Sequence, residues 1–146
     1  MAPGLLTAVP LEGGGFFSVD SLRGVWVLLL DSDPAGLRSL TQVLEYCGAL
    51  VTGVATPAQA LQVMRQVRPD VLVAAVSADE QEAVGLIRRV RAFKPEDGGV
   101  MPAIAVVPSA EIGEEYMRAG GFEGYLAKPV DPWRLCRMVS SLTMPR

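Results

Sequence analysis

The sequence contains no histidine among its 146 residues. This absence excludes Ser-His-Asp and Cys-His nucleophile pairs, zinc sites of the HExxH type and a role as a phosphohistidine donor. Cysteine is also scarce: Cys47 and Cys136 lie far apart in the sequence, outside any CxxC pair or ligand-spaced cluster. We therefore expect two ordinary buried thiols.

Basic residues are too few for a protein held on nucleic acid by phosphate contacts. The chain has 13 Lys and Arg against 16 Asp and Glu, a net charge of -3, which disfavours direct nucleic-acid binding. No uncharged apolar run approaches the ~20 residues that span a bilayer, and residues 1–15 lack the basic start of a secretory signal. The sequence therefore predicts a cytoplasmic protein that binds neither nucleic acid nor membrane.

The length and composition are those of one packed domain. Hydrophobic residues make up 50% of the chain and charged residues 20%, which is ample material for a single core. Residues 1–21 contain Pro3, Pro10 and the run Gly13-Gly14-Gly15 without sustained periodicity, which predicts a flexible N-terminal tail. The domain is then expected to occupy residues 22–146.

From Leu22 onward, short apolar runs alternate with amphipathic stretches, a pattern typical of a parallel α/β sheet. Strands are predicted at 25–30, 50–55, 71–76, 103–107 and 125–127. Helices are predicted after each strand, beginning at Asp33-Pro34, at Thr56-Pro57, after a polar loop at 77–81, at Ser109 and at Asp131-Pro132. Because crossovers between parallel strands are right-handed, we expect a doubly wound (βα)5 fold, with the flavodoxin-like strand order 2-1-3-4-5.

In this topology the functional crevice lies at the carboxyl ends of the strands, near the switch point between the first and third strands. The residues that follow the four relevant strands are Asp31-Ser32-Asp33, Ala75-Val76-Ser77, Val107-Pro108-Ser109 and Lys128-Pro129. Any binding site of the domain is therefore expected among these side chains.

Four short motifs frame these residues. They are Leu-Arg-Gly before the first strand, Arg-Pro-Asp before the third, Pro-Ala-Ile-Ala in the fourth and Ala-Lys-Pro-Val-Asp-Pro after the fifth. Through these motifs, residues 22–142 resemble the CheY-like receiver domain of two-component response regulators. The motifs are most similar to those of receivers carried by hybrid sensor histidine kinases. The resemblance implies the flavodoxin-like fold and a role in phosphorelay signal transduction.

The resemblance also implies a role for each position of the crevice. In the family, two acids after the first strand hold Mg²⁺ together with a phosphoacceptor aspartate that ends the third. A Thr or Ser after the fourth strand and a Lys after the fifth contact the phosphoryl oxygens. Here Asp31 and Lys128 match their positions, but the second acid is replaced by Ser32, the phosphoacceptor by Ala75 and the switch hydroxyl by Val107.

Three further positions bear on the same site. Tyr125 stands where the family has its switch aromatic, and Pro129 follows Lys128 where the family has a cis peptide bond. Asp79 replaces the family's proline in the loop after the acceptor. We therefore expect Tyr125 and Pro129 to occupy the family's positions, although the residues around them differ from those of the family.

The substitutions predict a degenerate site. A phosphoryl group needs a nucleophilic oxygen, and the methyl side chain of Ala75 has none. Mg²⁺ usually needs one or two carboxylates in octahedral oxygen ligation, and Asp31 is the only retained candidate ligand, so we expect no metal and no cofactor. Val107 removes the hydrogen bond that would report a phosphoryl group to Tyr125. The prediction is a pseudo-receiver, not an enzyme, that acts as a phosphorylation-independent protein-interaction module.

The partners implied by the resemblance are a histidine kinase, a phosphotransfer protein or another regulator domain, with a homodimer as a further candidate. Two alternative functions stay open. The vacated crevice could serve a small-ligand sensor, or phosphorylation could persist at a substitute acid among Asp31, Asp33 and Asp79.

Structural roles also fit several of these residues. Asp31 and Lys128 are suited to a partly buried ion pair, and Asp33 is suited to a helix cap. A basic cluster late in the third helix is expected to be a solvated helix face; it consists of Arg88, Arg89, Arg91 and Lys94.

Overall fold

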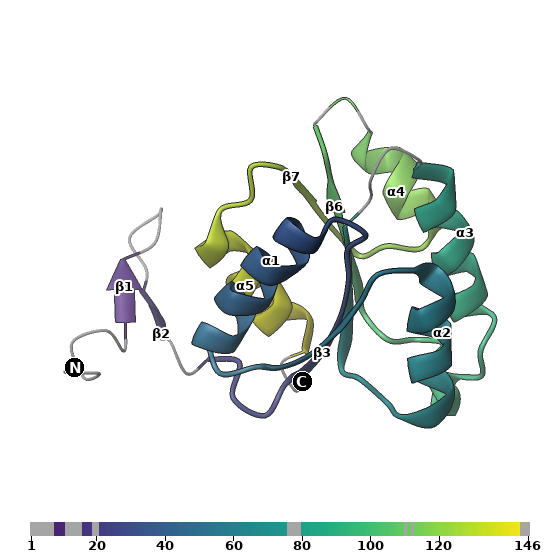
Figure 1. Cartoon of the computed structure of the whole chain (residues 1–146), viewed down its shortest axis with the longest axis horizontal. Helices are drawn as coiled ribbons and strands as arrows, with labels where there is room; N and C mark the ends of the chain where they lie inside the picture. The colour runs from purple at the N-terminus through teal and green to yellow at the C-terminus, as the bar shows by residue number, and fades with distance from the viewer. Residues whose placement is uncertain are drawn as a thin grey trace.

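Five parallel strands form one sheet in the order β4-β3-β5-β6-β7 (Figure 1). The computed structural model describes residues 8–10, 16–18, 21–75, 80–109, 111 and 113–143. The strands of the sheet are β3 (Trp26–Leu30), β4 (Leu50–Val54), β5 (Val71–Ala75), β6 (Ala103–Val107) and β7 (Gly124–Ala127). Counted along the domain, this order is 2-1-3-4-5, so the prediction of a flavodoxin-like doubly wound fold is confirmed.

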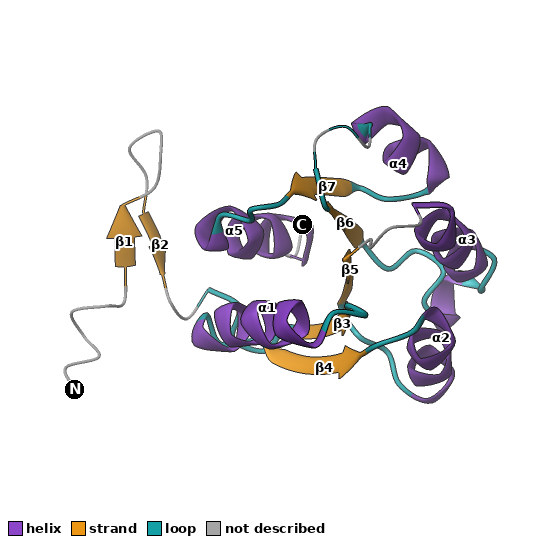
Figure 2. Cartoon of the chain, turned by 45° about the horizontal axis from the view of Figure 1, so that its top comes forward, coloured by secondary structure: helices purple, strands orange, loops and turns teal. Residues whose placement is uncertain are grey.

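The helices cover both faces of the sheet. They are α1 (Pro34–Tyr46), α2 (Pro57–Gln66), α3 (Glu80–Arg91), α4 (Glu114–Gly120) and α5 (Pro132–Thr143), with a short 3-10 turn, η2 (Pro95–Asp97). Figure 2 shows α1 and α5 on one face and α2, α3 and α4 on the other. None of the helices in the described part of the chain is long and apolar enough to cross a membrane.

The central strands are apolar at every position because both of their faces are covered. In β3, Val27 and Leu29 are buried in the cluster that contains α1 and α5 residues. Leu28 and Leu30 are buried in the cluster that contains residues of α2, α3 and α4. Such near-continuous apolar runs are typical of parallel strands between two helical layers, and they explain why the strands could be located from the sequence.

Three helices begin as predicted, with a polar side chain followed by proline. The carboxylate of Asp33 accepts hydrogen bonds from the N–H groups of Ala35 and Gly36 at the start of α1. Thr56 Oγ1 accepts from an N–H in the first turn of α2 at 3.2 Å, and Asp131 Oδ1 accepts from an N–H in the first turn of α5 at 2.9 Å. These caps satisfy backbone donors that the helices leave without partners.

Two predicted helix starts are wrong. α4 begins at Glu114 with Gly113 as its N-cap, because the Ser109 hydroxyl accepts a hydrogen bond from the N–H of Glu111 in a local turn. The predicted polar loop also extends too far, since Gln81 already belongs to α3. Residues 76–79 of that loop lie outside the described residues.

An antiparallel pair of short strands precedes the domain. β1 (Ala8–Pro10) pairs with β2 (Phe16–Ser18), with Val9 opposite Phe17. The sequence predicts no strands in residues 1–21, where the periodicity is too short to distinguish a strand from a tail. The remaining residues of this segment up to residue 20 lie outside the described residues, so the tail stays a prediction.

Candidate functional site

The carboxyl ends of the parallel strands meet at one edge of the sheet. Asp31 follows β3, Ala75 ends β5, Val107 ends β6 and Lys128 follows β7. The ladder pairs Ala75 with the residue before Val107, and the backbone N–H of Lys128 donates to the carbonyl oxygen of Val107 at 2.8 Å. The fold therefore brings these sequence-predicted positions to a common edge.

Asp31 is the one charged residue buried in the described part of the chain, with 3% of its surface exposed. Its N–H donates to the carbonyl oxygen of Val54, which extends the pairing of β3 with β4. Its Oδ1 accepts a hydrogen bond from the N–H of Asp33 at 2.9 Å. Its Oδ2 has no hydrogen-bond partner and lies 4.0 Å from Nζ of Lys128. The two side chains form an ion pair with one buried member and one partly exposed member.

The first turn of α1 packs directly against this carboxylate. A Cβ on Gly36 would overlap with Oδ2 of Asp31 and lie 3.2 Å from its Cγ. Gly36 also donates its N–H to the Asp33 carboxylate at 3.3 Å. The sequence interpretation missed Gly36. Glycine in the first turn of a helix lowers the stability of the helix, so its presence there could have indicated a close packing contact.

The two apolar replacements lie on opposite faces of the sheet. The methyl group of Ala75 belongs to the buried cluster that includes α1 and α5 residues. Val107 is fully buried in the other cluster, and the half-buried ring of Tyr125 packs against that cluster. Neither side chain carries an oxygen or nitrogen that could contact a ligand at the edge.

Two further predicted positions lie around this edge. Ser32 is exposed to solvent. The peptide bond between Lys128 and Pro129 is cis. Asp79, which the sequence offered as a substitute acid, lies outside the described residues.

The described side chains do not fit a magnesium ion. Asp31 Oδ1 and both carboxylate oxygens of Asp33 already accept backbone N–H groups. Ala75 and Val107 contribute no oxygen, and among the residues that the structure describes no group of three or more acidic or cysteine side chains is arranged to hold a metal. Mg²⁺ prefers near-octahedral oxygen ligation, usually with one or two carboxylates and several waters, and Asp31 and Asp33 at this edge offer it one carboxylate oxygen without a hydrogen bond, Oδ2 of Asp31.

A cavity of about 610 Å³ lies beside the ion pair, between α1 and α5. Lys128 and Ser39 are the lining residues with polar side chains, and the other lining residues are apolar or glycine. The lining residues are Gly36, Ser39, Leu40, Val43, Pro108, Lys128, Pro129, Val130, Pro132 and Leu135. The sequence interpretation did not predict this cavity, because its walls come from segments far apart in the chain.

Comparisons with known proteins give a relative in sequence and solved structures of the same fold. No family model matches the chain. The chain is 37% identical over 122 residues to an uncharacterized 14.6 kDa protein in the sodA1 3' region of Leptolyngbya boryana. The match covers 83% of this chain and 92% of that protein. The receiver domain of the sensor histidine kinase PA1611 from Pseudomonas aeruginosa PAO1 is 26% identical, with a TM-score of 0.74 over 84% of this chain and 99% of that chain.

A putative response regulator from Chloroflexus aurantiacus is 25% identical, with a TM-score of 0.73 over 83% of this chain and 98% of that chain. The chain therefore has the fold of the CheY-like response regulator receiver domains. This fold supports a role in two-component signalling, in which receiver domains interact with other proteins.

Proposed function

We propose that this receiver domain accepts no phosphoryl group and acts as a phosphorylation-independent protein-interaction module in two-component signal transduction. The observation that carries the proposal is Ala75 at the carboxyl end of β5, with its methyl group buried among apolar side chains. Phosphoryl transfer needs an oxygen nucleophile in line with the leaving group. A methyl group at the family's acceptor position offers none, which makes the domain a pseudo-receiver.

The scarcity of candidate metal-ligating side chains around Asp31 supports the same proposal. The PA1611 receiver domain has a magnesium ion coordinated in its active site cleft. In this chain Asp31 is the only retained candidate ligand, and one of its oxygens is already hydrogen-bonded to the backbone. Ser32, at the position of the family's second acid, is exposed. We therefore propose a domain that uses no metal and no cofactor.

The remaining family positions take structural roles in this proposal. Lys128 pairs with the buried carboxylate of Asp31 at 4.0 Å instead of contacting a phosphoryl oxygen. Val107 fills an apolar cluster beside Tyr125 in place of a switch hydroxyl. The domain would then keep one conformation, and we propose that it has no enzymatic activity of its own.

Output would pass through contacts with another protein. The proposed partners are a histidine kinase, a phosphotransfer protein or another regulator domain, and a second copy of the chain is a further candidate. An edge-to-face aromatic pair between α1 and α5 supports such a role, since Tyr46 and Trp133 have ring centroids 6.3 Å apart and Tyr46 is 51% exposed. A cytoplasmic location fits the two free thiols.

Radiolabelled acetyl phosphate with Mg²⁺ tests the proposal. We expect no label on the wild-type chain. The matched control is the triple variant S32D/A75D/V107T, which restores the family's chemistry and should become labelled. Label on the wild type that is lost in D31N, D33N or D79N would contradict the proposal and identify a substitute acceptor.

A small-ligand sensor is a second candidate, in the cavity of about 610 Å³ beside Lys128, whose lining does not include Ser32, Ala75 or Val107 of the predicted crevice. Its apolar wall and single ammonium group suit a small molecule with an apolar body and an anionic end. A thermal shift screen against metabolites and nucleotides tests it, since a ligand at 100 times its Kd adds about 2.7 kcal/mol of stability. A screen in which no compound raises Tm would count against this function.

A further inference from the structure

The fold brings together the only two cysteines of the sequence. Cys47 is the C-cap residue of α1, and Cys136 lies in α5. Both are free thiols, and both are fully buried in the cluster between the sheet and this helical layer. Their distance in the sequence had suggested two unrelated buried thiols.

The two residues share a hydrogen-bond acceptor. The N–H of Cys47 donates to the carbonyl oxygen of Val43 at 3.3 Å, and Sγ of Cys136 lies 3.8 Å from the same oxygen. Both side chains belong to the same buried cluster, where the end of α1 meets α5. The Cys136 sulfur therefore lies against the last turn of α1, which Cys47 ends, and a disulfide between the two residues requires Cα atoms about 4.4–6.8 Å apart.

The environment makes the two thiols chemically unequal. Interaction with the Cys136 side chain lowers the pKa of the Cys47 thiol, although burial acts in the opposite direction. The Cys47 side chain in turn raises the pKa of Cys136, and burial and the negative charge of Cys47 raise it further. Because the thiolate is the reactive form, and because Cys47 and not Cys136 lines a small cavity, Cys47 is the expected nucleophile and Cys136 the resolving thiol.

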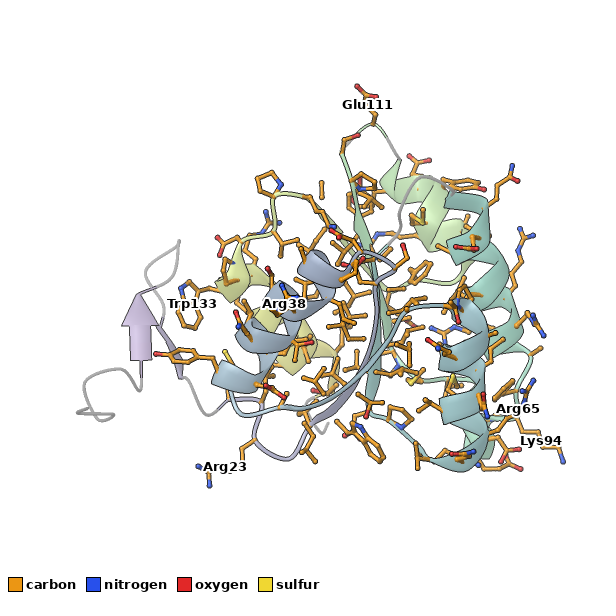
Figure 3. All side chains as sticks on the ribbon, viewed as in Figure 1. Arg23, Arg38, Arg65, Lys94, Glu111 and Trp133 are labelled. Atoms are coloured by element: carbon orange, nitrogen blue, oxygen red, sulfur yellow. The ribbon has the colours of Figure 1, made fainter. Side chains whose placement is uncertain are left out.

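A small cavity leads to Cys47. It has a volume of about 260 Å³ and is lined by Gln42, Val43, Tyr46, Cys47, Pro132 and Trp133. Trp133, which is labelled in Figure 3, belongs to α5 and lies near α1. A molecule the size of hydrogen peroxide fits in this volume, and Cys47, although fully buried, forms part of the cavity wall.

We propose that Cys47 and Cys136 form a reversible disulfide when the protein meets a peroxide. The Cys47 thiolate attacks one peroxide oxygen and breaks the O–O bond, which gives a sulfenic acid and, after protonation of the leaving oxygen, one water. The Cys136 sulfur then attacks the sulfenic sulfur, forms the S–S bond, loses its proton and displaces a second water. The two thiols lose two electrons in total, the peroxide gains them, and a dithiol reductant reverses the reaction.

The disulfide would connect the C-terminal end of α1 to α5. These two helices also line the cavity of about 610 Å³ beside Lys128. Oxidation would fix the distance between the helices at one end of that cavity. The inference rests on the two thiols and the small cavity at Cys47, and it is independent of whether the domain accepts a phosphoryl group.

Mass spectrometry of the full chain tests the disulfide. The folded protein is treated with hydrogen peroxide, unfolded in an alkylating reagent without reductant, and digested. We expect one cross-linked peptide pair containing Cys47 and Cys136, an intact mass lower by two hydrogens, and loss of the cross-link after a dithiol reductant. The urea midpoint of the oxidised protein should be higher than that of the reduced protein.

Two variants keep the test specific. C136S should trap a sulfenic acid on Cys47 that reacts with dimedone, whereas C47S should give much weaker dimedone labelling at Cys136. Full alkylation of both cysteines in the peroxide-treated wild type would overturn the proposal. So would sulfinic acid on Cys47 without a cross-link, or disulfides only between two chains, and these wild-type outcomes decide the matter even if a variant fails to fold.

Discussion

A carboxylate buried beneath a helix needs partners for its charge, and Asp31 has two kinds. One oxygen accepts a backbone N–H, and the other faces the Lys128 ammonium at 4.0 Å. Removing one member of such a pair leaves an uncompensated buried charge. The free-energy cost of that charge is larger than the free energy by which the intact pair stabilises the fold. The absence of a side chain at Gly36 makes room for this arrangement.

Replacing Gly36 with alanine tests this packing. We expect G36A to lower the free energy of unfolding by about 1–3 kcal/mol, because the new methyl group overpacks the Asp31 carboxylate. The matched control is G85A in the middle of α3, where a Cβ would meet no atom within 4 Å. G85A should raise stability by about 0.5–1 kcal/mol through helix propensity alone.

Urea denaturation monitored by circular dichroism measures both variants. If G36A were as stable as G85A, Asp31 would have another position available, and the close packing of α1 on the carboxylate would not constrain the site.

The end of α3 is held by one side chain that the sequence placed on a solvated face. Arg91 donates hydrogen bonds to the carbonyl oxygens of Gly99, Met101 and Gly121. It also pairs with the carboxylate of Glu123 at 2.9 Å, which in turn accepts the N–H at the start of β6. Arg91 therefore joins α3 to the loops that lead into β6 and β7. The prediction of a solvated face is wrong for this residue.

The R91K variant tests this connection between elements. Lysine keeps the charge but cannot reach several carbonyl oxygens with one planar group. We expect a loss of about 2 kcal/mol in the free energy of unfolding, since buried acceptors lose a charged donor.

The control is R88K, an exposed position of the same helix, which should stay within about 0.5 kcal/mol of the wild type. Chemical denaturation of both proteins gives the comparison. Equal midpoints for R91K and R88K would show that the loops hold their positions without Arg91.

The elements differ in how well the sequence predicts them. Strands β3, β5 and β6 were predictable because each is a local apolar run, and α1 began as predicted because Asp33 and Pro34 are local signals. The start of α4 was not, since its cap is Gly113, without a side-chain hydrogen bond. Contacts such as Arg91 with Glu123, or Cys47 with Cys136, depend on how distant segments pack, and no periodicity encodes them.

At the scale of the whole molecule, the sheet and both helical layers have the arrangement of a receiver domain, whereas we propose that the edge that carries the family's chemistry is altered. The order of the strands and the two buried clusters need no contribution from that edge. A stable fold can therefore persist while the side chains at its edge change. This separation underlies the proposal that the domain signals through a constant surface and not through a phosphorylation switch.

The candidate site was predictable in position but not in detail. The doubly wound topology alone located it at the carboxyl ends of the strands, and the resemblance to receivers supplied the roles of Asp31, Ala75 and Lys128. The contact of Asp31 with Gly36 and the cavity between α1 and α5 required coordinates.

The most direct test of the central claim is an amide NMR titration of the whole chain with Mg²⁺ and then with beryllofluoride, which mimics a phosphoryl group on an aspartate. The proposal predicts that the amide signals of Asp31, Ala75 and Lys128 stay unchanged in both steps. Shifts that begin at this edge with beryllofluoride and extend to Tyr125 and α4 would contradict it, because they would require an acceptor and a working switch.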